Sequence, residues 1–143
     1  MSNKVLIVAS YYYKDISNNL IKGATRILEN LNINYNIEKT DGSFEIPFMI
    51  NRNLKLYDGF IALGCIIRGE TYHFELISNE VTRKIMDLSI TSHKPIGFGI
   101  ITCENMQQAI ARSTLDQNVS NRLVGKSNKG NEAALAVANL IIK

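Results

Sequence analysis

Hydrophobic residues follow two different spacings along this chain. Residues 5–9 and 61–67 are continuous apolar runs, too short for typical helices, and therefore predict strands buried on both faces. Between and after these runs, apolar residues recur at steps of three and four, which is the spacing of amphipathic helices. Weaker apolar runs predict two more strands at residues 33–38 and 95–101.

Helices are predicted between these strands and at the end of the chain. Asp15 is a candidate N-cap for the first helix, and Pro47 is tolerated only in the first turn of the second. The charge of Glu104 suits the first turn of the fourth helix. Residues 113–129 are polar and indicate no particular element. The predicted helices lie at residues 15–31, about 47–56, 74–88, from 104 onward and 132–142.

This alternation of strands and helices predicts an α/β fold in a single domain, residues 1–143. Strand–helix–strand units of this kind give a four-stranded parallel sheet in a three-layer αβα sandwich, with right-handed crossovers. Ligands of open parallel sheets bind beyond the carboxyl ends of the strands. We therefore expect a site on the rim formed by residues 11–13, 41–45, 65–73 and 102–105.

Composition and charge narrow the range of functions. The chain has 143 residues, of which 45% are hydrophobic and 20% charged, as is typical of a globular protein. Its net charge of +3 is small and scattered, so we expect no nucleic-acid partner. We find no signal-peptide pattern, no membrane-spanning run and no metal-ligand cluster, and Cys65 and Cys103 form no CxxC pair. These features predict a cytoplasmic protein with free thiols and without a metal site.

Candidate chemistry concentrates after the strand at residues 61–67. The turn Gly69-Glu70-Thr71 precedes a helix N-terminus, where backbone N–H groups and a hydroxyl can bind an anion such as phosphate. An ordinary tight strand-to-helix turn would use the same residues. His73 follows, as a proton carrier near neutral pH or as a surface histidine. The GxGxxG and GxxxxGK[ST] motifs of nucleotide binding are absent.

Four motifs, in chain order, resemble those of the lumazine synthase family, and together they cover nearly the whole chain. The resemblance implies a flavodoxin-like fold and an enzyme that acts without a cofactor. The motifs are Gly42-Ser43-Phe44-Glu45-Ile46-Pro47, the segment from Leu63 to Phe74, the segment from Phe98 to Asn105, and Asn128-Lys129-Gly130.

The resemblance implies the penultimate reaction of riboflavin biosynthesis. In that reaction, 5-amino-6-(D-ribitylamino)uracil condenses with 3,4-dihydroxy-2-butanone 4-phosphate. His73 matches the family's acid/base, and Glu70 and Thr71 match its phosphate-binding turn. Tyr13 departs from the family, which often has a side-chain amide there. The residues that match its pyrimidine and ribityl contacts are Tyr12, Ser43, Phe44, Glu45, Cys65, Ile66 and Ile67, and Lys129 matches a lysine near the substrate.

Two further matches lie on a different part of the chain. Phe98 and Arg112 match residues that complete the site of a neighbouring subunit, with the arginine on phosphate. An insertion precedes Asn128, so counting back from Lys129 places Arg122 near the same position as Arg112. The spacing after Glu104-Asn105 favours Arg112, and the alternative stays open.

The resemblance also implies an assembly. The family's basic unit is a homopentamer with sites between subunits, and we expect that unit here. The inserted residues 113–128 lie where pentamers would meet in a capsid. We therefore expect a free pentamer, or two pentamers face to face as a decamer, and no shell. The alternative function is a flavodoxin-like module that binds a flavin or phosphorylated ligand without chemistry; such a module would not require His73.

Overall fold

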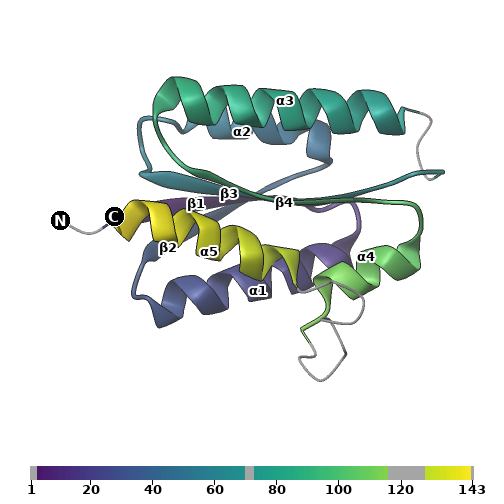
Figure 1. Cartoon of the computed structure of the whole chain (residues 1–143), viewed down its shortest axis with the longest axis horizontal. Helices are drawn as coiled ribbons and strands as arrows, with labels where there is room; N and C mark the ends of the chain where they lie inside the picture. Colours follow the sequence, from purple (N-terminus) through teal and green to yellow (C-terminus); the bar gives the residue numbers. More distant parts are fainter. Residues whose placement is uncertain (1–2, 70–72, 116–127, 143) are drawn as a thin grey trace.

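Four parallel strands form one sheet with helices on both faces (Figure 1). The computed structural model describes residues 3–69, 73–115 and 128–142. Helices α2 and α3 cover one face and α1, α4 and α5 the other, which confirms the predicted three-layer sandwich. In chain order the elements are β1 (Lys4–Ser10), α1 (Lys14–Asn30), β2 (Asn34–Thr40), the short 3-10 helix η1 (Ser43–Glu45), α2 (Ile46–Arg52), β3 (Gly59–Ile67), α3 (Phe74–Ser92), β4 (Ile96–Cys103), α4 (Met106–Ser113) and α5 (Lys129–Ile142).

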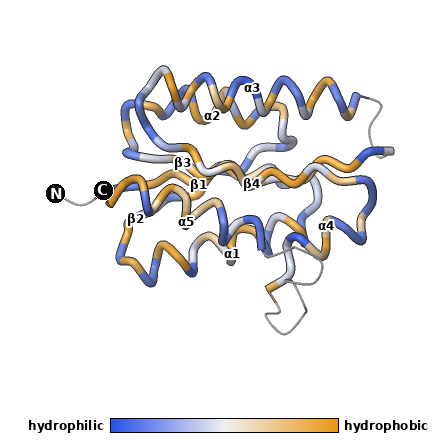
Figure 2. The backbone as a smooth tube through the Cα atoms, in the orientation of Figure 1, coloured by the Kyte–Doolittle hydropathy of each residue, from blue (hydrophilic) through white to orange (hydrophobic). Residues whose placement is uncertain are grey.

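The strand order β2-β1-β3-β4 places the two most apolar strands at the centre of the sheet. All nine residues of β3 are buried. Its side chains alternate between two hydrophobic clusters: Ile61 and Leu63 pack with α1 and α5, while Phe60 and Ala62 pack with α2 and α3. Figure 2 shows the corresponding alternation of hydrophobic and hydrophilic positions along α1 and α3. Truncating a central side chain such as Ile61 to alanine would cost about 2–5 kcal/mol.

The two edge strands of the sheet differ in what they expose. β2 exposes mostly polar side chains, among them Asn36, Glu38 and Lys39. β4 is largely buried and exposes Phe98 and Thr102 on its surface. None of the helices in the described residues combines the length and apolar character needed to cross a bilayer.

The predicted starts of α1 and α4 are wrong. Helix α1 begins at Lys14, with Tyr13 in extended conformation at the N-cap, so Asp15 lies in the first turn. Helix α4 begins at Met106, because Asn105 Oδ1 accepts a hydrogen bond from Gln108 N at 2.9 Å. Glu104 therefore precedes the cap instead of lying in the first turn.

Two other boundaries also depend on asparagine side chains. The second helix ends at Arg52 and not near Leu56, since Asn53 Nδ2 bonds to Met49 O at 2.8 Å and caps the helix. Helix α5 begins at Lys129, three residues earlier than expected, because Asn128 Oδ1 accepts from Asn131 N at 3.0 Å.

Candidate active site

A crevice opens between the two central strands at their carboxyl ends. Helix α1, which follows β1, and helix α3, which follows β3, lie on opposite faces of the sheet (Figure 1). The pairing of β1 with β3 stops at Ala9 and Leu63, whereas β3 continues to Ile67. The end of β3 therefore extends beyond its neighbour, at the point of an open α/β sheet where ligands bind.

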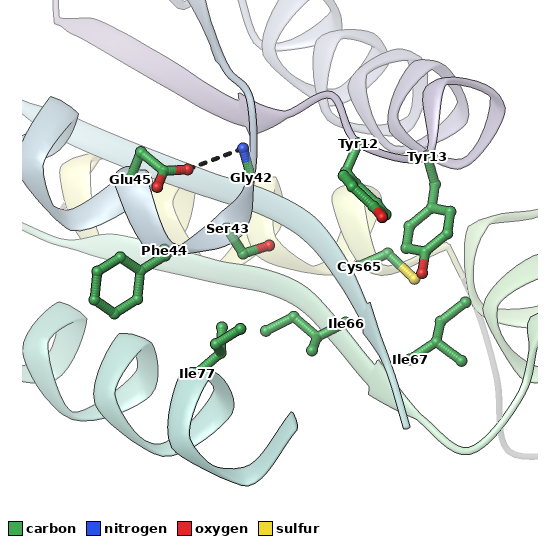
Figure 3. A pocket seen from close by; sticks show the side chains of 10 residues that line it. All are labelled: Tyr12, Tyr13, Gly42, Ser43, Phe44, Glu45, Cys65, Ile66, Ile67 and Ile77. Atoms are coloured by element: carbon green, nitrogen blue, oxygen red, sulfur yellow. Dashed lines mark hydrogen bonds between the residues drawn. The ribbon is translucent and has the colours of Figure 1, made fainter. Parts of the chain in front are cut away.

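A cavity at this crevice has a volume of about 270 Å³, and we call it the inner cavity (Figure 3). Its volume is near the lower end of the roughly 300–1,000 Å³ of small-molecule pockets. It gathers residues from three of the four predicted rim segments. The described residues that line it are Tyr12, Tyr13, Gly42, Ser43, Phe44, Glu45, Cys65, Ile66, Ile67 and Ile77.

Two tyrosines from the start of α1 form one wall of the inner cavity. The rings of Tyr12 and Tyr13 meet edge to face, with centroids 4.9 Å apart and planes at 84°. The Tyr12 side chain is 67% exposed. Because its ring is largely exposed, Tyr12 can stack on a flat heterocycle. Tyr13 adds a second ring at the position where the family often has a side-chain amide.

The short helix η1 supplies polar groups on the opposite wall. Ser43 Oγ is buried and has no hydrogen-bond partner among the described residues. A buried hydroxyl without a partner costs about 1–3 kcal/mol, so a polar ligand group in the cavity would relieve this cost. Glu45 Oε1 accepts a hydrogen bond from Gly42 N at 3.0 Å, which orients the carboxylate along the rim (Figure 3).

Cys65 contributes to the shape of the cavity and is a poor nucleophile. Burial raises the pKa of the Cys65 thiol far above its ordinary value, and the neighbouring Cys103 raises it further. Burial also raises the pKa of Cys103. Both cysteines are free and buried, so their thiols stay protonated at neutral pH.

The turn after β3 is held by an arginine that the sequence analysis did not select. Gly69 adopts φ +88°, a left-handed conformation that L side chains rarely adopt. Arg68 Nε lies 3.1 Å from Glu104 Oε2, and its Nη1 lies 3.2 Å from Glu75 Oε1. These carboxylates, Glu104 first, raise the pKa of Arg68. Arg68 thus ties the ends of β3 and β4 to the start of α3.

The predicted phosphate-binding turn and the predicted acid/base come directly after Gly69 in the chain. Glu70 and Thr71 lie outside the described residues. His73 is exposed at the N-cap position of α3, and its carbonyl oxygen accepts from Ile77 N at 2.8 Å. Ile77 lines the inner cavity, but His73 is not among its described lining residues. His73 therefore lies one helical turn before Ile77, on the predicted rim.

A second cavity, of about 240 Å³, lies along the outer side of β4, and we call it the edge cavity. Arg112 reaches it from α4 and donates from Nη1 to the Thr102 carbonyl oxygen at 3.2 Å. Lys129 reaches it from the first turn of α5, with Nζ 3.3 Å from Glu132 Oε1. The described residues that line it are Phe98, Ile100, Ile101, Thr102, Arg112 and Lys129.

Most of the predicted site residues that the structure describes line one of two cavities on adjacent strands, since Cys65 and Ile66 of the inner cavity pair with Ile101 and Thr102 of the edge cavity. The inner and edge cavities have no described lining residue in common. Phe98, Arg112 and Lys129 all belong to the edge cavity. Arg122, the alternative phosphate ligand, lies outside the described residues.

Some residues of these cavities lie outside the predicted rim segments: Ile77 lines the inner cavity, and Ile100 and Ile101 line the edge cavity. Tyr13 and Thr102 lie within those segments but were not singled out as site residues. The position of Ile77, one turn after His73 on an amphipathic helix, was the available signal. Within the described residues, no cluster of three or more histidine, cysteine or acidic side chains could hold a metal ion.

Comparison with known proteins shows the family. The family model described as 6,7-dimethyl-8-ribityllumazine synthase matches residues 2–143. A protein of that name from Bartonella henselae is 44% identical over 141 residues, covering 96% of this chain and 85% of the relative. One from Methylorubrum populi is 38% identical, covering 96% of this chain and 80% of the relative. The chain therefore belongs to the 6,7-dimethyl-8-ribityllumazine synthase family.

Proposed function

We propose that this chain carries out its family's condensation at a site that two neighbouring copies complete. Family membership makes the chain a transferase of riboflavin biosynthesis. The reaction joins 5-amino-6-(D-ribitylamino)uracil to 3,4-dihydroxy-2-butanone 4-phosphate. The observation that supports the shared site is that the inner cavity and the edge cavity have no described lining residue in common and differ in chemistry. One offers surfaces for a flat ring, and the other offers two cations.

The inner cavity binds the pyrimidine in this proposal. Tyr12 stacks on the ring, and the unpartnered Ser43 hydroxyl hydrogen-bonds to it or to the start of the ribityl chain. Phe44 and Glu45 contact the ring and ribityl hydroxyls from the outer rim. The backbone of Cys65, Ile66 and Ile67, where β3 extends past β1, contacts the edge of the pyrimidine.

The edge cavity of the next copy binds the phosphate side. Arg112 offers a planar guanidinium that can hold phosphate with two hydrogen bonds. Lys129 adds a second positive charge, and Phe98 covers the substrate from the partner's strand. Glu70 and Thr71 complete the phosphate site from the first copy, as the resemblance implies. The described residues that line the inner cavity include no lysine or arginine, which supports recruitment of a cation from a neighbour.

The chemistry requires proton transfer and positioning. The 5-amino group of the pyrimidine attacks the ketone carbon, and loss of water gives an imine. Removal of a carbon-bound proton then allows the C–O bond to phosphate to break, and His73 is the proposed proton carrier. The second amine closes the ring with loss of water. Arg112 stabilises the departing phosphate dianion by charge.

Complementation between two impaired variants tests the shared site directly. His73→Ala impairs the half of the site beside the inner cavity, and Arg112→Ala impairs the edge cavity. Chains of both kinds that assemble together should recover roughly a quarter of wild-type activity at equal mixing, since a random neighbour pair unites both intact halves that often. Each variant reassembled alone is the control.

Two outcomes would count against the proposal in different ways. If the wild-type assembly makes no ribityllumazine from the two substrates, the activity itself is contradicted. If the wild type is active and the mixture is no better than its components, the activity stands and the site lies within one chain.

We propose a homopentamer as the minimum assembly, with a decamer of two pentamers as the upper limit. The outer face of α3 supports an extensive contact, because Leu76, Met86 and Ile90 lie on one side of the helix and are 65%, 62% and 67% exposed. Phe44 and Phe48 add exposed rings on the same layer. Light scattering after size exclusion should give about five or ten times the 16.0 kDa chain mass. A monomer or a capsid-sized particle would contradict this assembly.

The cytoplasm is the proposed compartment. Cys65 and Cys103 are both free and buried. Free thiols persist in the reducing cytosol and are oxidised more readily outside it. Fractionation of cells that express the protein, followed by immunodetection, tests this location; recovery in a secreted fraction would contradict it.

A further inference from the structure

The side-chain amide of Asn128 joins three helices at one buried point. The residue is 7% exposed. Its Nδ2 donates to Ser113 O at 2.9 Å, to Asn19 O at 3.1 Å and more weakly to Thr114 O at 3.4 Å. Its Oδ1 accepts from Asn131 N at 3.0 Å. One amide therefore links α1, the end of α4 and the start of α5.

Two glycines make room for this amide. A Cβ atom on Gly23 would lie 2.1 Å from Asn128 Oδ1. A Cβ atom on Gly130 would lie 2.0 Å from Leu20 O. Both distances are far below van der Waals contact, so α1 and the first turn of α5 approach as closely as they do only because these positions lack side chains. The amide is thus enclosed by backbone and leaves little space for another group.

The backbone partners of Asn128 are next to the two cations of the edge cavity. Ser113, the strongest acceptor, directly follows Arg112, and Lys129 directly follows Asn128. Ser113 and Asn128 are 15 residues apart in the chain, so no local turn sets their distance. Ser113 Oγ also donates back to Ala109 O at 2.8 Å, which keeps the last turn of α4 regular up to this contact.

We propose that Asn128 is a positioning residue that sets the spacing between Arg112 and Lys129 in the phosphate half of the shared site. The inference rests on the proposed function of the edge cavity. An amide is needed because the position must donate to carbonyl oxygens on one side and accept from the α5 N–H on the other. A group that only caps α5 would satisfy the second requirement alone.

Asn128→Asp separates these two roles. Aspartate caps a helix as well as asparagine does, but its carboxylate cannot donate and would face three carbonyl oxygens. Asn128→Ser is the milder variant, because its hydroxyl still caps α5 without filling the same space. Asn53→Asp is the matched control: it removes the bond from Nδ2 to Met49 O at the end of α2, away from both cavities.

The experiment measures steady-state kinetics on the assembled enzyme, inhibition by inorganic phosphate and the unfolding midpoint. For Asn128→Asp and Asn128→Ser we expect the KM of the butanone phosphate and the Ki of phosphate to rise roughly tenfold, with the pyrimidine KM unchanged, since a displacement of about 1 Å is enough for such losses. Asn53→Asp should lower the unfolding midpoint without raising the KM of one substrate more than that of the other.

Several results would overturn the assignment. If both Asn128 variants bind phosphate as tightly as the wild type does, Asn128 acts only as the N-cap of α5. Equal losses for both substrates, in proportion to lost stability and shared by Asn53→Asp, would indicate a general structural role. Failure of both variants to fold would show a folding requirement instead. An inactive wild-type enzyme would contradict the proposed function, whereas the dissociation constant of inorganic phosphate, measured by isothermal titration calorimetry, still tests Asn128 in that case.

Discussion

The inner cavity and the edge cavity are similar in size but opposite in chemistry. The first is lined by aromatic and aliphatic side chains, an unpartnered hydroxyl and one carboxylate. The second combines two cations with a half-exposed phenylalanine. A flat ring fits the first and a phosphate fits the second. Neither cavity carries both sets of groups in its described residues, and that is the strongest structural reason to expect a site assembled from two copies.

The two cavities also differ in how their walls are held. The inner cavity is formed where central strands end, and β3 behind it is buried along its whole length. The edge cavity lies beside an edge strand, and its cations come from helices that meet through Asn128. The buried sheet therefore supports the wall that we propose for ring binding, while one amide links the helices that carry the proposed phosphate-binding cations.

The largest expected effect belongs to the edge cavity. Arg112→Ala should lower kcat/KM for the butanone phosphate by roughly 10–100-fold, because hydrogen bonds to a charged group are worth about 1.5–3 kcal/mol. The pyrimidine KM should change little. Steady-state kinetics with each substrate varied in turn measures the two effects separately. Arg122→Ala is the comparison, and it should behave like the wild type; the reverse pattern would transfer the phosphate contact to Arg122.

His73 tests whether the rim beyond the inner cavity takes part in the reaction. His73→Ala should lower kcat by about tenfold or more with little change in stability, because it removes the proposed proton carrier and the residue is exposed. His93→Asn is the control at the other end of α3, since asparagine tolerates the left-handed φ of +59° found there. An unchanged kcat in His73→Ala would make His73 an ordinary surface residue.

Tyr12 tests the ring-binding wall in the same way. Tyr12→Ala should raise the pyrimidine KM by roughly two- to tenfold, since aromatic stacking is worth about 0.5–1.5 kcal/mol. The KM of the butanone phosphate should stay close to its wild-type value. Tyr12→Phe keeps the ring and should remain near wild type. Equal effects of Tyr12→Ala and Arg112→Ala on both substrates would remove the distinction between the cavities.

The smallest expected effect concerns the thiols behind the inner cavity. A thiol whose pKa is higher in the folded than in the unfolded state stabilises the fold at low pH and loses that contribution as pH rises past its unfolded pKa. The free energy of unfolding should therefore fall above about pH 9, by up to about 1.4 kcal/mol per pH unit for each such thiol. Urea titrations between pH 8 and 10 measure this slope, which Cys65→Ala should reduce.

The sequence predicted the layers and strands well because hydrophobic spacing is a local property. The runs at residues 5–9 and 61–67 became the buried strands β1 and β3, and the sheet is parallel as the alternation predicts. The errors lie at helix ends. Whether Asp15 or Tyr13 caps α1, and whether α4 includes Glu104 or begins after Asn105, depends on the backbone direction at the end of the preceding strand.

The candidate site was predicted in part. The rim segments were identified from strand ends, and the resemblance supplied the roles of Phe98, Arg112 and Lys129. The division into two cavities depends on which side of β3 and β4 each residue reaches, and that is set by packing across the sheet. The contact of Asn128 with Asn19, which is 109 residues away, leaves no pattern in the sequence.

The unequal edges of the sheet bear on the fate of a copy that has not yet assembled. Strand β2 ends the sheet with exposed charges such as Glu38 and Lys39, which discourage another strand from adding there. Strand β4 has no such charges on its exposed positions and presents Phe98 at 41% exposure. An isolated copy is therefore protected against aggregation along one edge and vulnerable along the other. In the proposed assembly, the contact that completes the active site would also cover this edge and so help to keep the newly made protein in solution.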